Sequence, residues 1–195
     1  RVRRLRDEMA GMELDGFLVP RADEHQGEYV PASAERLSWL TGFTGSAGVA
    51  LILRSRAILF VDGRYTLQAR GQADPDLFEI ESLVENPPHK WMADNLSKGA
   101  RIGFDPWLHT IGEVRTLRKA LQKLQAEAVP LDVNLIDTIW EDQPPPPAEP
   151  ARVHPLDLAA QAEREALRGE DLRRLLGELV VHPREEAGEE LDDGD

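Results

Sequence analysis

The chain has 195 residues, of which 41% are hydrophobic and 30% are charged, and it contains no cysteine. This composition suits a soluble globular protein with one domain and an appendage, or two small domains, without disulfides or thiolate chemistry. No apolar run approaches the ~20 residues of a membrane helix, and the start RVRRLR lacks the apolar core of a signal peptide. The formal net charge of -13 disfavours a nucleic-acid partner. We therefore predict a cytoplasmic protein that binds neither nucleic acid nor membrane.

Apolar periodicity predicts alternating helices and strands up to residue 140. Spacings of three and four indicate amphipathic helices, and short aliphatic and aromatic runs indicate buried strands. Strands alternating with helices are typical of an α/β layered domain, and a hairpin within it makes the sheet mixed. The expected strands are 16–19, 47–53, 57–61, 77–84, 101–104 and 128–133. The expected helices are an N-terminal one ending between Gly11 and Gly16, then 34–40, 66–71, 91–96 capped by Gly99, 110–127 and 134–140.

The helix predicted over 110–127 is the longest, and its two faces differ. We expect one apolar stripe to face the core, while the basic residues of the other face are interpreted as a solvated surface. The stripe consists of Ile111, Val114, Leu117, Leu121 and Leu124.

The rest of the chain is organised around TGFTGSAGVALILRSRAILFVDGRY, residues 41–65. Two apolar runs joined by a short polar turn predict a β-hairpin. The preceding TGFTGSAG has neither the GxGxxG nor the GxxxxGK[ST] spacing, so we interpret it as a tight structural turn and not as a phosphate cradle.

Two segments carry the candidate binding residues. The second hairpin strand ends in Asp62-Gly63-Arg64-Tyr65, and the long polar loop over 21–33 contains His25. Functional side chains concentrate in such loops at the edge of a sheet. A lone loop histidine is also compatible with plain solvated surface, and Arg64 is also compatible with a surface ion pair to Asp62.

The composition changes after residue 142. Residues 143–155 contain PPPP and further prolines, which favours an extended spacer. Residues 156–181 are compatible with a helix, and the acidic end REEAGEELDDGD is expected to be disordered. We therefore predict a domain over 1–142, a proline-rich linker over 143–155 and a helical and disordered acidic tail over 156–195.

Five strings in order, DEHQGEYVP, TGFTGSAG, FVDGRYTLQA, RIGFDP and NLIDTIWEDQPPPP, resemble the N-terminal domain of Xaa-Pro aminopeptidases (aminopeptidase P). That family belongs to the creatinase and prolidase superfamily. The resemblance covers residues 1 to about 155 and implies a mixed six-stranded sheet flanked by helices, which precedes a pita-bread catalytic domain. The pattern analysis agrees with this fold.

The resemblance also implies a function and its limits. The family releases the N-terminal residue ahead of proline with two divalent metals, Mn or Zn, held by a catalytic domain. This chain shows no such ligand set, so we predict no catalytic residue, no metal site and no activity of the chain alone. Arg64 of the DGRY string matches a family arginine that reaches toward the peptide, and we name His25 beside it as a candidate substrate-binding residue.

Three functions remain open at this point. The chain is a substrate-shaping and assembly domain of an Xaa-Pro aminopeptidase, a stand-alone peptide-binding module, or an interaction protein that pairs with a full-length homologue. For the first, the expected partner is a proline-containing peptide. The full-length form is expected to be homo-oligomeric and the isolated domain monomeric, because net charge opposes close approach. A truncated gene, a frameshift or a deliberately shortened chain would each give the acidic end.

Overall fold

The computed structural model describes residues 1–150, and within it Arg1–Ala148 form one compact unit. The α-helices are α1 (Val2–Gly11), α2 (Arg36–Thr41), α3 (Thr66–Gln72), α4 (Pro88–Asn95), α5 (Ile111–Gln122) and α6 (Leu135–Ile139). The strands are β1 (Gly16–Pro20), β2 (Gly48–Leu53), β3 (Ala57–Val61), β4 (Glu79–Ser82), β5 (Arg101–Phe104) and β6 (Glu127–Pro130). Three 3-10 turns complete them: η1 (Ala32–Ala34), η2 (Gly63–Tyr65) and η3 (Pro106–Leu108).

The six strands form one mixed sheet in the order β4-β3-β2-β1-β5-β6. The two central pairings, β1 with β2 and β2 with β3, are antiparallel, and the three others are parallel. The hairpin predicted within 41–65 is thus the β2–β3 pair at the middle of the sheet. The predicted mixed six-stranded sheet with flanking helices is confirmed.

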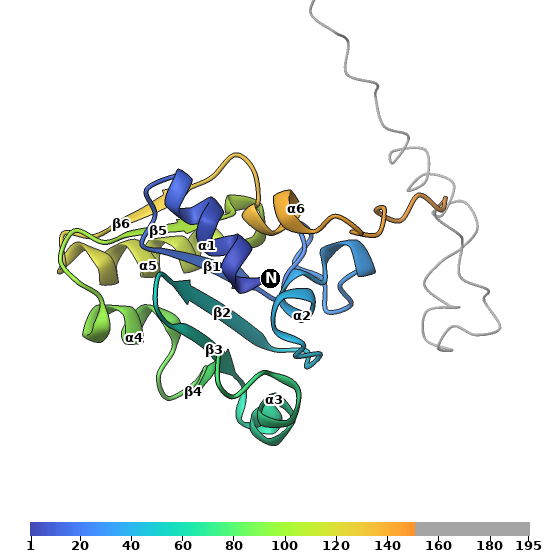
Figure 1. Cartoon of the computed structure of the whole chain (residues 1–195), viewed down its shortest axis with the longest axis horizontal. Coiled ribbons are helices and arrows are strands. Elements are labelled where there is room, and N and C mark those ends of the chain that lie inside the picture. The colour runs from blue at the N-terminus through green and yellow to red at the C-terminus, as the bar shows by residue number, and fades with distance from the viewer. Residues whose placement is uncertain (151–195) are drawn as a thin grey trace, which may run out of the picture. The chain divides into compact units, whose positions relative to one another are not determined.

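Alternate residues of the central strands pack into two separate cores, because successive side chains of a strand point to opposite faces. Phe17, Ile52 and Leu59 belong to the core under α1, α2, α3 and α6. Leu51 and Phe60 point the other way, into the core under α4 and α5. Figure 1 shows α1 and α6 apart from α4 and α5, with the strands between them. Every residue of β1 and β3 is buried, as expected for strands covered on both faces.

Polar contacts attach the end of the compact unit to its beginning. Arg36 of α2 donates two hydrogen bonds to Asp137 of α6, at 2.7 and 2.8 Å. Trp39 and Trp140 stack with ring centroids 5.2 Å apart. Because forked arginine–carboxylate pairs are both strong and directional, they hold α6 against α2 in one orientation.

A second polar contact lies beneath α6. The buried Asn134 side chain donates to the buried Asp105 carboxylate at 2.9 Å and, as the N-cap, accepts from the backbone N–H of Ile136. The segment after β5 and the start of α6 are thereby joined, and both polar groups are paired, as burial requires.

The predicted element over 110–127 is wrong at its end. Helix α5 stops at Gln122, and Gln125 adopts a left-handed backbone with φ of 52°, after which Glu127 begins β6. Helical periodicity alone missed this, because β6 has to start opposite Arg101 of β5. The predicted strand over 128–133 correspondingly ends at Pro130.

Three apolar residues expected in buried elements are exposed. Ile111 is 71% exposed at the first turn of α5, Val133 is 54% exposed beyond β6, and Val84 is 72% exposed beyond β4. The predicted strand over 77–84 shortens to β4 because Phe78 instead donates its backbone N–H to Asp74 in a turn. Likewise α4 ends at Asn95, so Gly99 follows the helix by four residues and does not cap it.

The described part of the linker, residues 143–150, contains neither helix nor strand. The domain boundary near residue 143 stays a prediction. The helix predicted over 156–181 and the disordered acidic end lie outside the described residues.

Substitution of a central leucine tests the two-sided burial. Leu51→Ala, in a side chain with 0% exposure, is expected to lower the free energy of unfolding by about 2–5 kcal/mol, from lost burial and a residual cavity. Leu67→Ala is the matched control, because Leu67 is 84% exposed, and it should change stability by less than about 0.5 kcal/mol. Urea unfolding followed by tryptophan fluorescence measures both, and equal effects would contradict two-sided burial.

Candidate functional site

Several loops meet at one end of the sheet. The carboxyl ends of β1, β3, β4, β5 and β6 and the amino end of antiparallel β2 all lie there, as their pairing directions require. Two of the emerging segments carry the sequence-predicted site residues, His25 and Arg64, and a third is the glycine-rich turn before β2. We call these segments the rim: residues 21–31 after β1, residues 41–47 before β2, and residues 62–65 after β3.

Glycines of the rim turn are required by close packing. Gly42 has φ of 80° and ends α2 in the left-handed conformation that glycine adopts most readily. A Cβ at Gly45 would lie 2.2 Å from the Phe43 ring and 3.0 Å from Tyr65. The turn thus presses Phe43 into the core, where it is 1% exposed. The structure supports the interpretation of TGFTGSAG as a structural turn.

The polar loop of the rim is organised by Asp23. Its Oδ1 accepts the backbone N–H groups of His25 and Gly27 at 3.1 and 2.9 Å, and the residue is only 4% exposed. Arg21 donates from its side chain to the carbonyl of Glu28 at 3.0 Å, which closes the loop. This hydrogen bonding accounts for part of the loop's unusual polarity.

His25 itself points into solvent. Its side chain is 81% exposed, and Nε2 lies 3.8 Å from a carboxylate oxygen of Glu24. Because such an exposed pair is weak, the imidazole can meet a ligand without first breaking a strong contact. Its assignment as a binding residue stays a prediction.

Arg64 is both paired and accessible. Its Nε donates to Asp62 Oδ1 at 2.9 Å, and its backbone N–H donates to the same oxygen at 3.0 Å. The side chain nevertheless remains 71% exposed. Since Asp62 engages Nε, the two terminal nitrogens of the guanidinium have no partner among the described residues. The ion pair considered from sequence is present, and it leaves this second set of donors for a ligand.

The electrostatics of this pair follow from its hydrogen bonds. The backbone N–H of Arg64, and then its guanidinium, lower the pKa of the Asp62 carboxyl below the ordinary 3.8. The same contact raises the pKa of Arg64, so the guanidinium stays charged.

Tyr65 and Ser46 extend the rim and were not identified from sequence. Their hydroxyl oxygens lie 2.7 Å apart, which joins the glycine turn to η2, and this hydrogen bond lowers the pKa of Tyr65 from 10.0. The Arg64 guanidinium carbon lies 5.3 Å from the centroid of the Tyr65 ring. The signal available in the sequence was the DGRY string itself, but the partner of its tyrosine is set by tertiary packing.

His25 and Arg64 share the rim without touching. No hydrogen bond or ion pair joins them within residues 1–150, and their strands β1 and β3 are separated by β2. Because they lie on loops that follow different strands, the two side chains can contact different parts of one extended ligand.

The described residues do not fit a dinuclear metal centre. Among residues 1–150 no group of three or more histidine, aspartate or glutamate side chains is arranged to hold a metal ion. We therefore derive no chemical step through metal ions on these residues. In the same part of the chain, no helix is long and apolar enough to cross a membrane.

His109 is the contrasting histidine, because burial controls it. It packs edge-on against Phe104, with ring centroids 5.6 Å apart, and its Nε2 is buried without a hydrogen-bond partner among the described residues. Burial lowers its pKa from 6.5, although Glu113 and Asp105 oppose this effect. The Nε2 atom is buried, while the ring borders a hollow of about 620 Å³ between α4 and α5.

The comparisons with known proteins identify relatives of the whole described unit. Residues 1–139 match the Creatinase/Prolidase N-terminal domain family. Aminopeptidase P1 of Lotus japonicus is 40% identical over 164 residues, 84% of this chain and 24% of its own length. A probable Xaa-Pro aminopeptidase P of Aspergillus clavatus is 37% identical over 179 residues, 90% of this chain and 27% of its own length. The chain thus spans about a quarter of these relatives.

Solved structures agree. An X-prolyl aminopeptidase from Caenorhabditis elegans, described as a cytosolic enzyme with a di-nuclear active site, superposes with a TM-score of 0.73 at 27% identity, over 91% of this chain and 31% of that one. The N-terminal domain of the cytoplasmic peptidase PepQ from Mycobacterium tuberculosis gives a TM-score of 0.54 at 27% identity, over 71% of this chain and 96% of that one.

The Asp62–Arg64 geometry predicts a graded change in acidity. Arg64→Gln should raise the pKa of Asp62 but leave it below its ordinary value, because the backbone N–H, its largest stabilising contact, remains. A lowered carboxyl pKa stabilises the fold above the unfolded-state pKa, and that contribution disappears as pH falls through the folded-state value. Carboxyl-carbon NMR titration measures the shift. An unchanged pKa in the variant would contradict the side-chain contact.

The burial of His109 predicts that the stability of the fold depends on pH, here through desolvation and not through hydrogen bonding as at Asp62. A lowered histidine pKa means that the unfolded chain binds the proton more readily, so stability should fall as pH drops below 6.5. His109→Phe preserves the ring and removes the buried nitrogen, and the part of the acid-side loss due to His109 should disappear. Unfolding at pH 7.5 and 5.5 measures it, with His25→Phe as the exposed control. An equal acid-side loss in wild type and His109→Phe would contradict the burial effect.

Proposed function

Because the chain belongs to the Creatinase/Prolidase N-terminal domain family, we propose that it is the non-catalytic N-terminal domain of an Xaa-Pro aminopeptidase. Such an enzyme releases the N-terminal residue ahead of proline. The accessible guanidinium of Arg64, which Asp62 holds at the rim, is the observation that supports a role in substrate binding. Its role is to shape the substrate cleft of the complete enzyme.

The rim performs binding and orientation, and it does not break a bond. Asp62 fixes Nε of Arg64, so the two remaining nitrogens face a ligand in a defined direction and can donate to a peptide carbonyl or carboxylate. His25, on the loop that follows β1, contacts another part of the same proline-containing peptide. A positioned guanidinium limits the orientations of a flexible peptide, which is how substrate-positioning residues accelerate a reaction.

The chemistry belongs to the remainder of the enzyme. The chain spans about a quarter of its relatives, and its described residues offer no metal-ligand cluster. Two divalent metals, Mn or Zn, bound elsewhere would supply the nucleophile by activating water. This chain alone is therefore inactive toward Xaa-Pro peptides.

The setting follows from the same relationship. A cytoplasmic location is supported by the relative described as cytosolic. Assembly into a homo-oligomer is assigned to the complete enzyme, while this chain alone is a monomer because its net charge of -13 opposes association at low salt.

A chimera tests the role of Arg64. Residues 1–148 would replace the matching segment of the Caenorhabditis elegans X-prolyl aminopeptidase, and hydrolysis of an Xaa-Pro peptide would be measured beside thermal unfolding. Arg64→Ala is expected to lower kcat/KM by about 10-fold to 100-fold, since hydrogen bonds to charged groups contribute about 1.5–3 kcal/mol. The melting temperature should not change, because the surface pair with Asp62 contributes little.

Arg70→Ala is the matched control, because Arg70 is an exposed arginine of α3 outside the rim. It should leave both kcat/KM and the melting temperature unchanged. The chain alone, with added Mn²⁺ or Zn²⁺, should release no amino acid. A lower melting temperature in Arg64→Ala, with activity per folded molecule intact, would make Arg64 a structural residue and remove the proposed role.

A further inference from the structure

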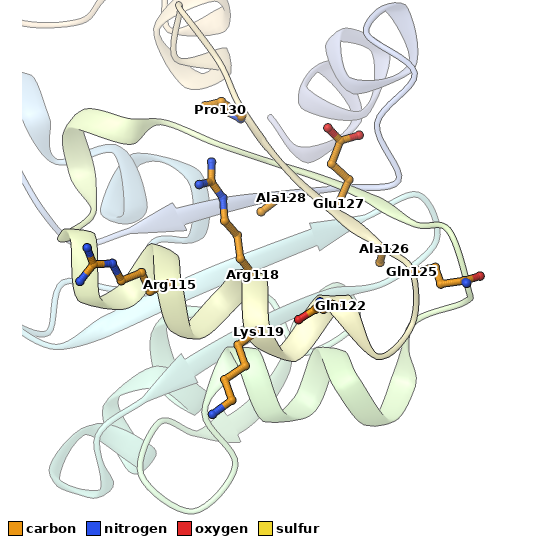
Figure 2. Close-up of a pocket in the computed structure, with 9 residues that line it drawn as sticks. All are labelled: Arg115, Arg118, Lys119, Gln122, Gln125, Ala126, Glu127, Ala128 and Pro130. Atoms are coloured by element: carbon orange, nitrogen blue, oxygen red, sulfur yellow. The ribbon is translucent and has the colours of Figure 1, made fainter.

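A basic hollow lies at an edge of the sheet that the rim does not use. It has a volume of about 970 Å³ and is bounded by the exposed flank of α5 and by residues 126–130 around β6. Figure 2 shows Arg118 extending from α5 toward the strand, with Arg115 and Lys119 on neighbouring turns of the helix. Glu127 extends to the other side of the strand.

The three cations are unpaired and lie together. Seven other arginines within residues 1–150 form ion pairs, whereas Arg115, Arg118 and Lys119 make no hydrogen bond or ion pair with any described residue and all line this one hollow. They stand in a chain whose net charge is -13. Because unpaired like charges repel one another, this cluster stabilises nothing within the described fold and favours an anionic partner.

The strand beside these cations has unused hydrogen-bonding groups. Among residues 1–150, β6 is the last strand of the sheet, and its outer side has no neighbouring strand there. The N–H groups of Glu127 and Leu131 donate inward, to carbonyls of Ala100 and Phe104. Because alternate residues of a strand address opposite sides, the N–H and C=O of Ala128 point away from β5, toward the hollow, while its side chain is buried and the whole residue is 7% exposed.

We infer that the β6 edge binds an extended acidic peptide, which adds to the sheet as a short seventh strand beside α5. The backbone of the peptide pairs with Ala128, and its acidic side chains meet the cations of the helix. Strand addition of this kind takes affinity from main-chain hydrogen bonds and specificity from alternate side chains.

Arg118 is the cation that faces the strand. Figure 2 shows its guanidinium extending toward β6, whereas Lys119 extends from the opposite side of the helix. Alternate residues of an extended peptide share one face. A carboxylate on the face toward α5 therefore meets Arg118, and Arg115 follows within about 4.5 Å of helix rise.

Pro130 limits the length of the added strand. It lacks an N–H at an outward position of β6, so only Ala128 supplies both a donor and an acceptor. A proline and a short edge strand also discourage uncontrolled pairing with other sheets. The site is consequently suited to a short segment that is recognised mainly by charge pattern, and a second copy would bring like charges together if the two β6 edges paired.

The test measures binding of a nine-residue peptide to the full chain. The peptide has aspartate at alternate positions and threonine between them, and its binding is measured by fluorescence anisotropy at low salt. Arg118→Glu is expected to weaken binding at least tenfold, and Arg70→Glu, the charge-matched control on α3, by less than threefold. A peptide with asparagine in place of aspartate should not bind. Amide NMR should show the largest change at Ala128.

A second peptide separates strand addition from general charge attraction. Methylation of every second backbone nitrogen of the peptide keeps every carboxylate and removes the peptide N–H groups that would donate to β6, so binding should fall at least tenfold. Equal binding of the methylated peptide, or equal losses in Arg118→Glu and Arg70→Glu, would overturn the inference. So would tighter binding of duplex DNA than of the peptide, or self-association that Arg118→Glu abolishes. None of these results concerns the rim, so the proposed function is tested separately by the chimera.

Discussion

Burial of β1, β2 and β3 on both faces is the constraint on which the rest of the structure depends. A sheet of this kind exposes two apolar surfaces, and each has to be covered by helices before the fold is stable. Helices α1, α2, α3 and α6 cover one surface, and α4 and α5 cover the other. The loops at the end of the sheet can then be polar and accessible, because the strands and helices form the core without them.

The attachment of α6 makes this covering specific. Apolar contact alone would let a five-residue helix pack in several orientations, since dispersion and hydrophobic contact are not directional. The forked contact of Arg36 with Asp137 and the buried contact of Asn134 with Asp105 select one orientation. One nitrogen of Arg36 remains buried without a partner among the described residues, which is a cost of placing an ion pair there.

The rim and the basic edge use the same sheet in different ways. At the rim, strand ends deliver side chains from three segments, and most of the polar groups there hold the loops in place, with Arg64 and His25 left accessible. At the β6 edge, the backbone groups of Ala128 face away from β5 and the cationic side chains come from α5. Both arrangements require the strand order β4-β3-β2-β1-β5-β6, because it places the hairpin centrally and β6 last.

The sequence by itself predicted most of the helices and strands, because periodicity records which face of each element is buried. It also named Arg64 and His25 as candidate binding residues, and that role stays a prediction. It also predicted the β2–β3 hairpin from adjacent apolar runs. Only the tertiary structure decided the end of α5 at Gln122, the exposure of Ile111, and the pairing of Ser46 with Tyr65. These depend on strand register and on contacts between segments distant in the chain, and no local pattern of residues encodes such contacts.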